Sequence, residues 1–434
     1  MDERKENDQE MKGKGSVDAL RAVGIIAEYN PFHNGHKYHL QQSMEKTGAD
    51  VSVAVISGNF TQRGELAVLD KWTRAEMAVR NGVDLVVEMP VLFACNNAGY
   101  FARGGVEILE NLGAEWISFG SESGNIDRLL EISQAMKSHA DELNSYAGKA
   151  VKEGLAYPRA RQEALIKVLS ETCSMGGTSK DPSEWRLQED RDELEEILIH
   201  PNNLLALEYL KTMKTAEPIT VRRQGSGYYE LEPKGSMASA TGIRKMLAQG
   251  EDISRLVPDI TREILMEHRR NLGDEEKLFT LLAGRILMSQ PRELNHIFGA
   301  EEGLGNKMKN NIRYWKSYED ILDGLKSKRY TRTRIGRLLA MTLMGTGRTD
   351  VKQAQNYIRV LAFDEKGGRY LKQVKKSNRC MLPVLTNLNK ELAVFPELER
   401  TIAKDILASD LYNLACGKDL YENSDYVKMP VRIV

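Results

Sequence analysis

The sequence predicts an α/β protein with a Rossmann-like parallel sheet, followed by a helical and basic C-terminal region. Short apolar runs alternate with helical patterns over residues 22–120. From about residue 262 onward, nearly all of the chain has apolar residues at three- and four-residue intervals, which is typical of helices. Basic residues concentrate in 307–379, where there are 19 Lys and Arg against 6 Asp and Glu.

Five short apolar runs are predicted to be strands: 22–27, 51–57, 84–90, 115–120 and 219–223. They lack alternation of polar and apolar residues, which indicates burial on both faces of a sheet. Helices are predicted between the first four runs, at 36–47, 70–81 and 98–112. Strands separated by helices of this length imply βαβ units and therefore parallel neighbours.

The composition excludes several classes of protein. No apolar run approaches the length of a membrane span, so we expect no membrane partner. The charged residues 1–21 lack the apolar stretch of a secretory signal, and we expect them to be a disordered N-terminal extension. The four cysteines form no CxxC pair, which argues against a zinc knuckle or a disulfide framework. These features together predict a cytoplasmic protein.

Three of the seven histidines lie within seven residues, directly after the first predicted strand. In such sheets ligands bind beyond the carboxyl ends of the strands, and a helix N-terminus there favours anions. Gly35 allows the backbone to approach a phosphate chain closely. His33 and His36 are the predicted catalytic residues, because imidazole N–H groups in the first helical turn can stabilise charge on a triphosphate under attack.

Two motifs resemble those of the nucleotidylyltransferase superfamily. His33-Asn34-Gly35-His36 resembles the (H/T)xGH signature, and the stretch SATGIR at 239–244 resembles the second motif, which opens a late helix. Thr241 is a candidate cap of that helix, and Arg244 a candidate ligand of the β- and γ-phosphates. A histidine metal site is the rival interpretation, but a third ligand at suitable spacing is lacking, and we expect no protein metal site.

Six stretches, in this order, resemble the bacterial tRNA(Met) cytidine acetate ligase family: GIIAEYNPFHNGHKYHL, SGNFTQRGELAVLDKWTRAEMAVRNGVDLVVEMP, FARGG, FGSE, PNNLLALEYLK and SATGIRK. The resemblance begins near residue 22, covers most of the chain and is tightest in the first hundred residues. It implies that acetate and ATP form acetyl-adenylate and pyrophosphate. The acetyl group would then move to N4 of the wobble cytidine of elongator tRNA(Met).

The resemblance also implies a set of ATP-binding residues: Ile26, Ala27, Glu28, Tyr29, Asn30, Pro31, Phe32, His33, Asn34, Gly35, His36, His39, Gly120, Asn202, Asn203, Arg223, Ser239, Thr241 and Arg244. Arg63 is the predicted acetate or phosphate contact, while Lys71 and Arg74 are either further contacts or surface charges. Asn203 has a rival role in helix capping, and His39 one as helix surface. Mg²⁺ is expected to accompany ATP, held mainly by phosphates and water.

The basic region predicts a tRNA-binding surface. Its candidate contacts are Lys326, Lys328, Arg329, Arg332, Arg334, Arg337, Lys375 and Lys376. Tyr314, Trp315, Tyr318 and Tyr330 are interleaved with them and can either stack on unpaired bases or pack between helices, and packing is favoured for Trp315. A solvated helical surface is the alternative interpretation of the charges.

We therefore predict three regions: the extension 1–21, a nucleotidylyltransferase-like ATP-binding catalytic domain at 22–258, and a mostly helical tRNA-binding domain at 259–434. Two other functions compete with the acetate ligase. An adenylyltransferase of a small phosphorylated cofactor precursor would have no need for the basic helical region. A non-catalytic RNA-binding protein would have no need for intact HNGH and SATGIR motifs.

Overall fold

The computed structural model describes residues 19–155, 157–174, 189–223, 238–377 and 379–434, so most of the predicted N-terminal extension lies outside the described residues. One mixed sheet in the order β5-β4-β1-β2-β3-β6-β7 forms the centre, with β8 paired to β6. The five predicted strands are confirmed as parallel neighbours. They are β1 (Ala22–Ala27), β2 (Val51–Ser57), β3 (Leu85–Met89), β4 (Trp116–Ser121) and β5 (Glu217–Arg222).

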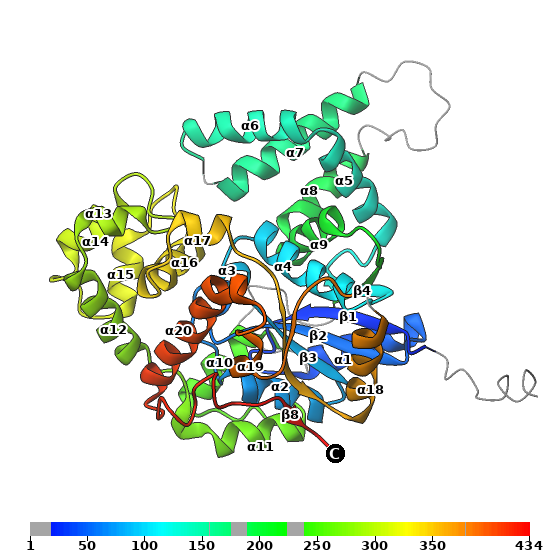
Figure 1. Ribbon diagram of the computed structural model, residues 1–434. Helices are drawn as coiled ribbons and strands as arrows, with labels where there is room; N and C mark the ends of the chain where they lie inside the picture. The colour runs from blue at the N-terminus through cyan, green and yellow to red at the C-terminus, as the bar shows by residue number, and fades with distance from the viewer. Residues whose placement is uncertain (1–18, 156, 175–188, 224–237, 378) are drawn as a thin grey trace, which may run out of the picture.

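Helices cover both faces of this sheet (Figure 1). The three predicted helices are confirmed as α1 (Asn34–Thr47), α2 (Lys71–Arg80) and α4 (Ala98–Asn111). Val53 and Val55 of β2 pack into the core beneath α4, whereas Ala54 and Ile56 pack into the core beneath α1 and α2. The lack of polar alternation in β2 therefore follows from burial on both sides.

The described residues between β4 and β5 form five helices, which rise above the sheet in Figure 1. They are α5 (Ile126–Ser138), α6 (Ala140–Lys152), α7 (Tyr157–Ser174), α8 (Glu189–Ile199) and α9 (Pro201–Thr212). The last of them packs against both α4 and α5, and it also contacts β4. This packing places α9 beside the carboxyl end of β4.

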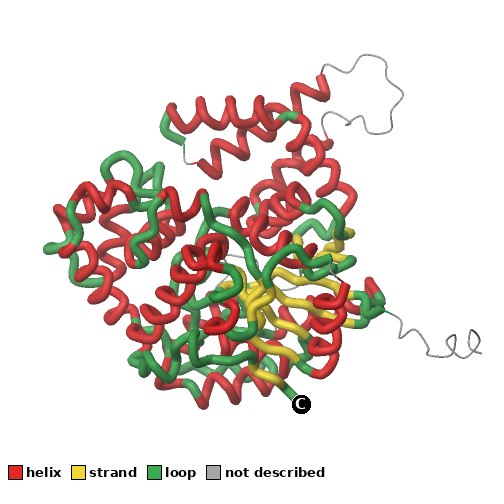
Figure 2. The backbone as a smooth tube through the Cα atoms, in the orientation of Figure 1, coloured by secondary structure: helices red, strands yellow, loops and turns green. Residues whose placement is uncertain are grey.

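Among the described residues, helices follow one another from residue 240 to residue 352, in line with the helical pattern predicted from about residue 262. These helices are α10 (Ala240–Gln249), α11 (Asp259–Glu267), α12 (Glu275–Met288), α13 (Pro291–His296), α14 (Leu304–Asn311), α15 (Tyr318–Leu325), α16 (Arg332–Leu343) and α17 (Arg348–Lys352). Helices α12 to α16 surround a second apolar core that also includes Val91 and Leu92 of α3 (Val91–Ala94). Figure 2 shows this helical body beside the sheet.

The C-terminal region is mostly helical, as predicted, but it also contains three short strands that were not predicted from the sequence. β6 (Ile358–Phe363) pairs antiparallel with β3, and β7 (Val384–Leu385) and β8 (Val431–Arg432) pair with β6. The run IRVLAF is apolar and too short to be a buried helix, and it covers the edge that β3 would otherwise leave open. The sheet therefore extends past the predicted domain boundary at residue 258.

Three further helices complete the fold. They are α18 (Glu365–Ser377), α19 (Leu388–Glu391) and α20 (Glu399–Cys416). α18 crosses the amino ends of the strands, since Gln373 exchanges hydrogen bonds with the backbone of Leu20 and Tyr370 donates to the carbonyl of Leu112. A search of the described helices found none with the length and apolarity that a bilayer crossing requires.

Candidate nucleotide site

A pocket of about 430 Å³ opens at the carboxyl ends of three neighbouring parallel strands. Its walls include Ala27 at the end of β1, Gly120 in β4 and Arg222 at the end of β5. The first turns of α1 and α10 also line it. The pocket thus lies where the strand order of a doubly wound sheet predicts a ligand, and two helix N-termini face it.

The two predicted catalytic histidines are stacked on each other at the start of α1. Their ring centroids are 3.7 Å apart, and the ring planes meet at 21°. His33 is the N-cap of α1, and its backbone N–H donates to Nδ1 of His36 at 3.3 Å. The ring of Tyr29 meets His36 edge-on, with centroids 4.9 Å apart. These contacts hold both imidazoles in place before any ligand binds.

All three clustered histidines are neutral at neutral pH. Burial, reinforced by Arg223 and Arg244, lowers the pKa of His33 from 6.5 to about 3. Burial and Arg223 likewise lower the pKa of His39 to about 4, and burial with the neighbouring His33 lowers that of His36 well below its usual value. Neutral imidazoles can donate N–H groups to an anion, while Arg223 and Arg244 carry the positive charge beside them.

The arginines are positioned by separate elements. Arg244 on α10 donates from Nη1 to the carbonyl of Asn30 at 2.9 Å, and its Nη2 lies 3.4 Å from a carboxylate oxygen of Glu65. Arg223 follows β5, and a Cβ on Gly120 would come within 3.3 Å of its Cγ. The cap of α10 is Ser239, whose Oγ accepts from the N–H of Gly242, so the predicted capping role of Thr241 is wrong.

An apolar wall on one side of the pocket was not predicted from the sequence. Phe119 of β4 and Tyr209 of α9 have ring centroids 5.8 Å apart, and Leu204, Leu205 and Phe101 lie beside them. A flat base such as adenine can pack against such a surface. Phe119 directly precedes Gly120 at a strand end, so its position was a usable signal. Tyr209, Leu204 and Leu205 reach the pocket because α9 packs on β4. No local sequence pattern predicts that packing.

Most of the predicted ligand-binding residues line this pocket. They are Ile26, Ala27, Glu28, Tyr29, Asn30, His33, Gly35, His36, His39, Arg63, Gly120, Asn202, Arg223, Ser239, Thr241 and Arg244. Pro31, Phe32, Asn34 and Asn203 do not line it. Asn34 donates to the carbonyl of Arg255 at 2.9 Å. Asn203 is fully buried, and its Oδ1 accepts from the N–H groups of Glu122 and Ser123, so it holds the turn after β4.

Lys71 and Arg74 are neither pocket residues nor surface charges, so both predicted alternatives are wrong. Both side chains are fully buried. Lys71 pairs with Glu88 and Asp425, each at 2.8 Å. Arg74 donates to four backbone carbonyls, those of Glu28, Ser57, Gly58 and Leu69. Arg74 therefore ties together the carboxyl ends of β1 and β2, next to the pocket.

Three of the four arginines in the basic cluster 326–337 are paired with carboxylates. Arg332 binds Glu319, Arg334 lies 2.6 Å from Glu301, and Arg329 lies 3.1 Å from Glu302. Arg337 instead donates to the carbonyl of Gln62 at 3.4 Å, beside the pocket. Lys326 and Lys328 are exposed. The prediction of tRNA contacts therefore applies to a surface whose charges are partly neutralised within the protein.

The other basic candidates and the aromatics lie in different settings. Lys375 and Lys376 are exposed near the end of α18, at the amino edge of the sheet and away from the pocket. Tyr318 and Tyr330 are buried, and Trp315 lies against Gly324 of α15, as the packing interpretation predicts. Tyr314 is 78% exposed, so of the four interleaved aromatics it can reach a base without rearrangement.

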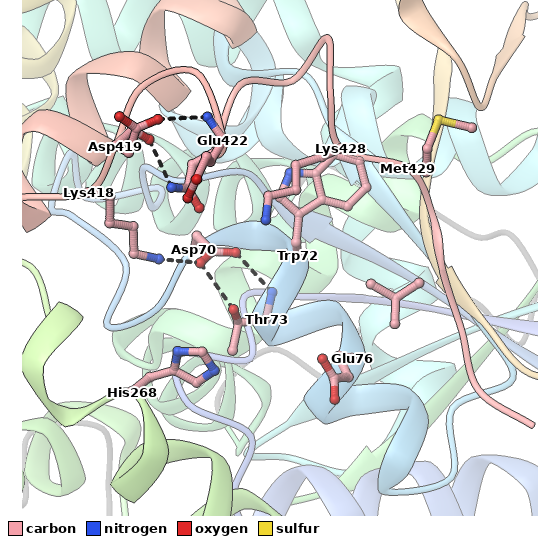
Figure 3. A pocket seen from close by; sticks show the side chains of 12 residues that line it. Asp70, Trp72, Thr73, Glu76, His268, Lys418, Asp419, Glu422, Lys428 and Met429 are labelled. Atoms are coloured by element: carbon pink, nitrogen blue, oxygen red, sulfur yellow. Dashed lines mark hydrogen bonds and ion pairs between the residues drawn. The ribbon is translucent and has the colours of Figure 1, made fainter.

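A second cavity, of about 420 Å³, lies between α2 and the C-terminal segment 417–431 (Figure 3). Lys418 meets Asp70 there at 2.5 Å, and Asp70 also caps α2. Its other walls include the charged side chains of Glu76, Glu422 and Lys428. Among the residues that the structure describes, no group of three or more His, Cys, Asp or Glu is arranged to hold a metal ion.

Comparison with known proteins places this architecture in a family. Residues 20–425 match the family described as HIGH Nucleotidyl Transferase. A tRNA(Met) cytidine acetate ligase of Thermoanaerobacter sp. is 37% identical over 423 residues, which cover 95% of this chain and 99% of the relative. Another, from Caldicellulosiruptor saccharolyticus, is 38% identical over 405 residues, covering 91% and 94%.

Solved structures agree. Crystal structures of Thermotoga maritima TmcAL, without ligand and bound with alpha-thio ATP, match with TM-scores of 0.85 and 0.84. Both are 30% identical to this chain and cover 95% of it and 100% of their own length. The chain therefore belongs to the HIGH nucleotidyl transferase family and to the family of tRNA(Met) cytidine acetate ligases.

Proposed function

We propose that the protein is an ATP-dependent ligase that joins acetate to N4 of the wobble cytidine of elongator tRNA(Met). One observation carries this proposal: the stacked rings of His33 and His36 line the same pocket as Arg223 and Arg244. Neutral donors, two guanidinium groups and a helix N-terminus together match a polyphosphate chain. The apolar wall supplies a surface for adenine, and the related Thermotoga maritima TmcAL has been crystallised with alpha-thio ATP bound.

In the first step an acetate oxygen attacks the α-phosphorus of ATP, and the bond to pyrophosphate breaks. Acetate is already ionised at neutral pH, so this step needs no base. His33 and His36 donate to the α-phosphate oxygens, and Arg223 and Arg244 hold the departing pyrophosphate. We assign the acetate carboxylate to Arg63, which also lines the pocket. Mg²⁺ would be held mainly by the phosphates and water, and it would offset part of the negative charge of the triphosphate.

In the second step N4 of the cytidine attacks the acetyl carbonyl carbon, AMP leaves and the nitrogen loses a proton. Glu28 is the carboxylate that lines the pocket among the described residues. Its Oε1 accepts from the N–H of Gln62 at 2.7 Å, which fixes the side chain. We assign to Glu28 the role of taking this proton. Since both substrates, tRNA and ATP, are cytoplasmic, the reaction is placed in the cytoplasm.

The tRNA is bound by the region that begins near residue 259, with the basic cluster 326–337 nearest to the pocket. Phosphate groups of an RNA can compete with Glu319 and Glu301 for Arg332 and Arg334, because both ion pairs are partly exposed to solvent. Lys375 and Lys376 would contact the tRNA only if it also reached the amino edge of the sheet.

Pyrophosphate exchange into ATP, measured with and without acetate, tests the first step. Transfer of labelled acetate to a tRNA(Met) transcript tests the second, with a transcript carrying uridine at the wobble position as the control. We expect acetate-dependent exchange, and transfer to the cytidine transcript alone. If the rate of pyrophosphate exchange did not depend on acetate but rose with a small phosphorylated acceptor, the result would support a cofactor adenylyltransferase instead.

A further inference from the structure

A short hairpin, residues 60–66, follows β2 and lies between the nucleotide pocket and α16. Phe60 and Leu66 form an antiparallel bridge. The N–H of Thr61 donates to the carbonyl of Glu65 at 2.9 Å, and the N–H of Gly64 donates to the carbonyl of Thr61 at 3.0 Å. Gly64 has φ +81°, which a side chain would disfavour. The hairpin is therefore a tightly bonded unit rather than a loose loop.

One side of the hairpin belongs to the pocket. Gln62 and Arg63 line it, and the N–H of Gln62 holds the Glu28 carboxylate. Glu65 pairs with Arg244 at 3.4 Å. A displacement of the hairpin would consequently move Arg63 and Glu28, the two groups assigned to the acyl end of the reaction. Arg244 would keep its 2.9 Å bond to the carbonyl of Asn30.

The other side of the hairpin rests on α16, backbone against backbone. A Cβ on Gly336 would overlap the carbonyl oxygen of Arg63, and a Cβ on Gly64 would overlap the carbonyl group of Gly336. Arg337, the next residue of α16, donates to the carbonyl of Gln62 at 3.4 Å. This contact leaves no flexible side chain between the two elements, so a shift of one is passed directly to the other.

The same helix carries Arg332 and Arg334 on its first turn, within the cluster predicted to hold tRNA. We propose that the Gly64–Gly336 contact is a positioning device for acetyl transfer, because it fixes the distance between the tRNA-bearing helix and the acyl end of the pocket. This inference rests on the proposed function. Displacement by a fraction of an ångström misaligns the cytidine amine with the acetyl carbonyl, without removing any group that binds ATP.

The test is Gly336→Ala, with Gly284→Ala as the matched control. Both glycines lie inside helices, so both variants gain the same helix propensity, but a Cβ on Gly284 meets nothing within 4 Å. We expect Gly336→Ala to lower the rate constant of acetyl transfer at least about tenfold. The KM for acetate should rise, because the displaced hairpin carries Arg63, but pyrophosphate exchange at saturating acetate and tRNA affinity should stay within about twofold of wild type. In Gly284→Ala the transfer rate constant, exchange and tRNA affinity should all stay within about twofold.

Arg337→Met provides a second route that inserts nothing at the contact. It removes the hydrogen bond to Gln62 and also one charge of the basic cluster, so transfer is measured at saturating tRNA. There the rate constant of acetyl transfer should fall, to a smaller extent than in Gly336→Ala, while exchange at saturating acetate stays within about twofold of wild type. Transfer at the wild-type rate in Gly336→Ala would overturn the inference, and so would an equal loss of exchange and transfer. Thermal unfolding of each variant identifies a folding defect, in which case Arg337→Met decides. Failure of wild-type protein to acetylate tRNA would instead refute the proposed function.

Discussion

The buried ion cluster beneath α2 provides the sharpest stability prediction. Lys71 contacts both oxygens of Glu88 and one oxygen of Asp425, all within 2.9 Å, and the three side chains are at most 3% exposed. Arg359 is also buried there and donates to the backbone carbonyl of Asp425. Two positive and two negative side chains therefore balance. Although burial lowers the pKa of Lys71, Asp425 and Glu88 together raise it above its ordinary value.

Asp425→Asn keeps the shape of the side chain but leaves one buried positive charge without a counterpart. Breaking a buried pair in this way costs about 3–5 kcal/mol of the free energy of unfolding. The loss should appear as a lower midpoint in urea at an unchanged dependence on denaturant. Because Asp425 belongs to the C-terminal segment that also carries Lys418, the segment should become more sensitive to protease in the native protein.

Glu163→Gln is the matched control. It removes one carboxylate from the Arg159–Glu163 pair, whose side chains are 76% and 49% exposed and lie one helical turn apart. An exposed pair of this kind contributes about 0.3–0.5 kcal/mol. If Asp425→Asn cost no more than this control, the buried cluster would not be the stabilising contact that its geometry implies.

Three further predictions concern the site and the basic helix. His36→Ala should slow acetate-dependent pyrophosphate exchange by about 10²–10³-fold, because a donor to the reacting phosphate is lost, and an unchanged rate would contradict this role. Burial holds the pKa of His33 at about 3 and that of His39 at about 4, against 6.5 in the unfolded chain. Between pH 4 and pH 6.5 the unfolded chain binds more protons at these histidines than the folded chain does. The free energy of unfolding should therefore reach its full value above pH 6.5. It should decline toward pH 4 by up to about 1.4 kcal/mol per unit for each histidine, as urea titrations at several pH values would detect. Arg332→Glu with Arg334→Glu should weaken tRNA binding and reduce its salt dependence in filter assays, and an unaltered salt slope would place the RNA surface elsewhere.

The sequence allowed the catalytic half of the fold to be predicted because its signals are local. Each of the five strands is a contiguous apolar run, and HNGH follows the first of them directly. A motif at a strand end must lie at the carboxyl edge of a parallel sheet, whatever the rest of the chain does. The same logic extends to Gly120 at the end of β4 and to Arg223 after β5, which line the pocket from two further strands.

The errors fall where a residue's role depends on a distant partner. Arg74 was interpretable as a pocket ligand or a surface charge, yet its partners include the carbonyl of Glu28, 46 residues away. Asn203 follows a proline in the manner of a helix cap, but it bonds the turn at Glu122, 81 residues away. Neither partner leaves a trace in the spacing of nearby residues, so propensity and motif could not choose between the alternatives.

By itself, the sequence determined the parallel strands, the helices between them, and the placement of HNGH and SATGIR at two helix N-termini. Those features follow from periodicity and from short-range geometry. The tertiary structure alone decided that β6 joins the sheet, that Lys71 meets Asp425 354 residues away, and that Gly336 lies against the hairpin beside the pocket. These contacts form only when folding buries segments that are far apart in the sequence against one another. The periodicity of residues along the chain does not show which distant segments will meet.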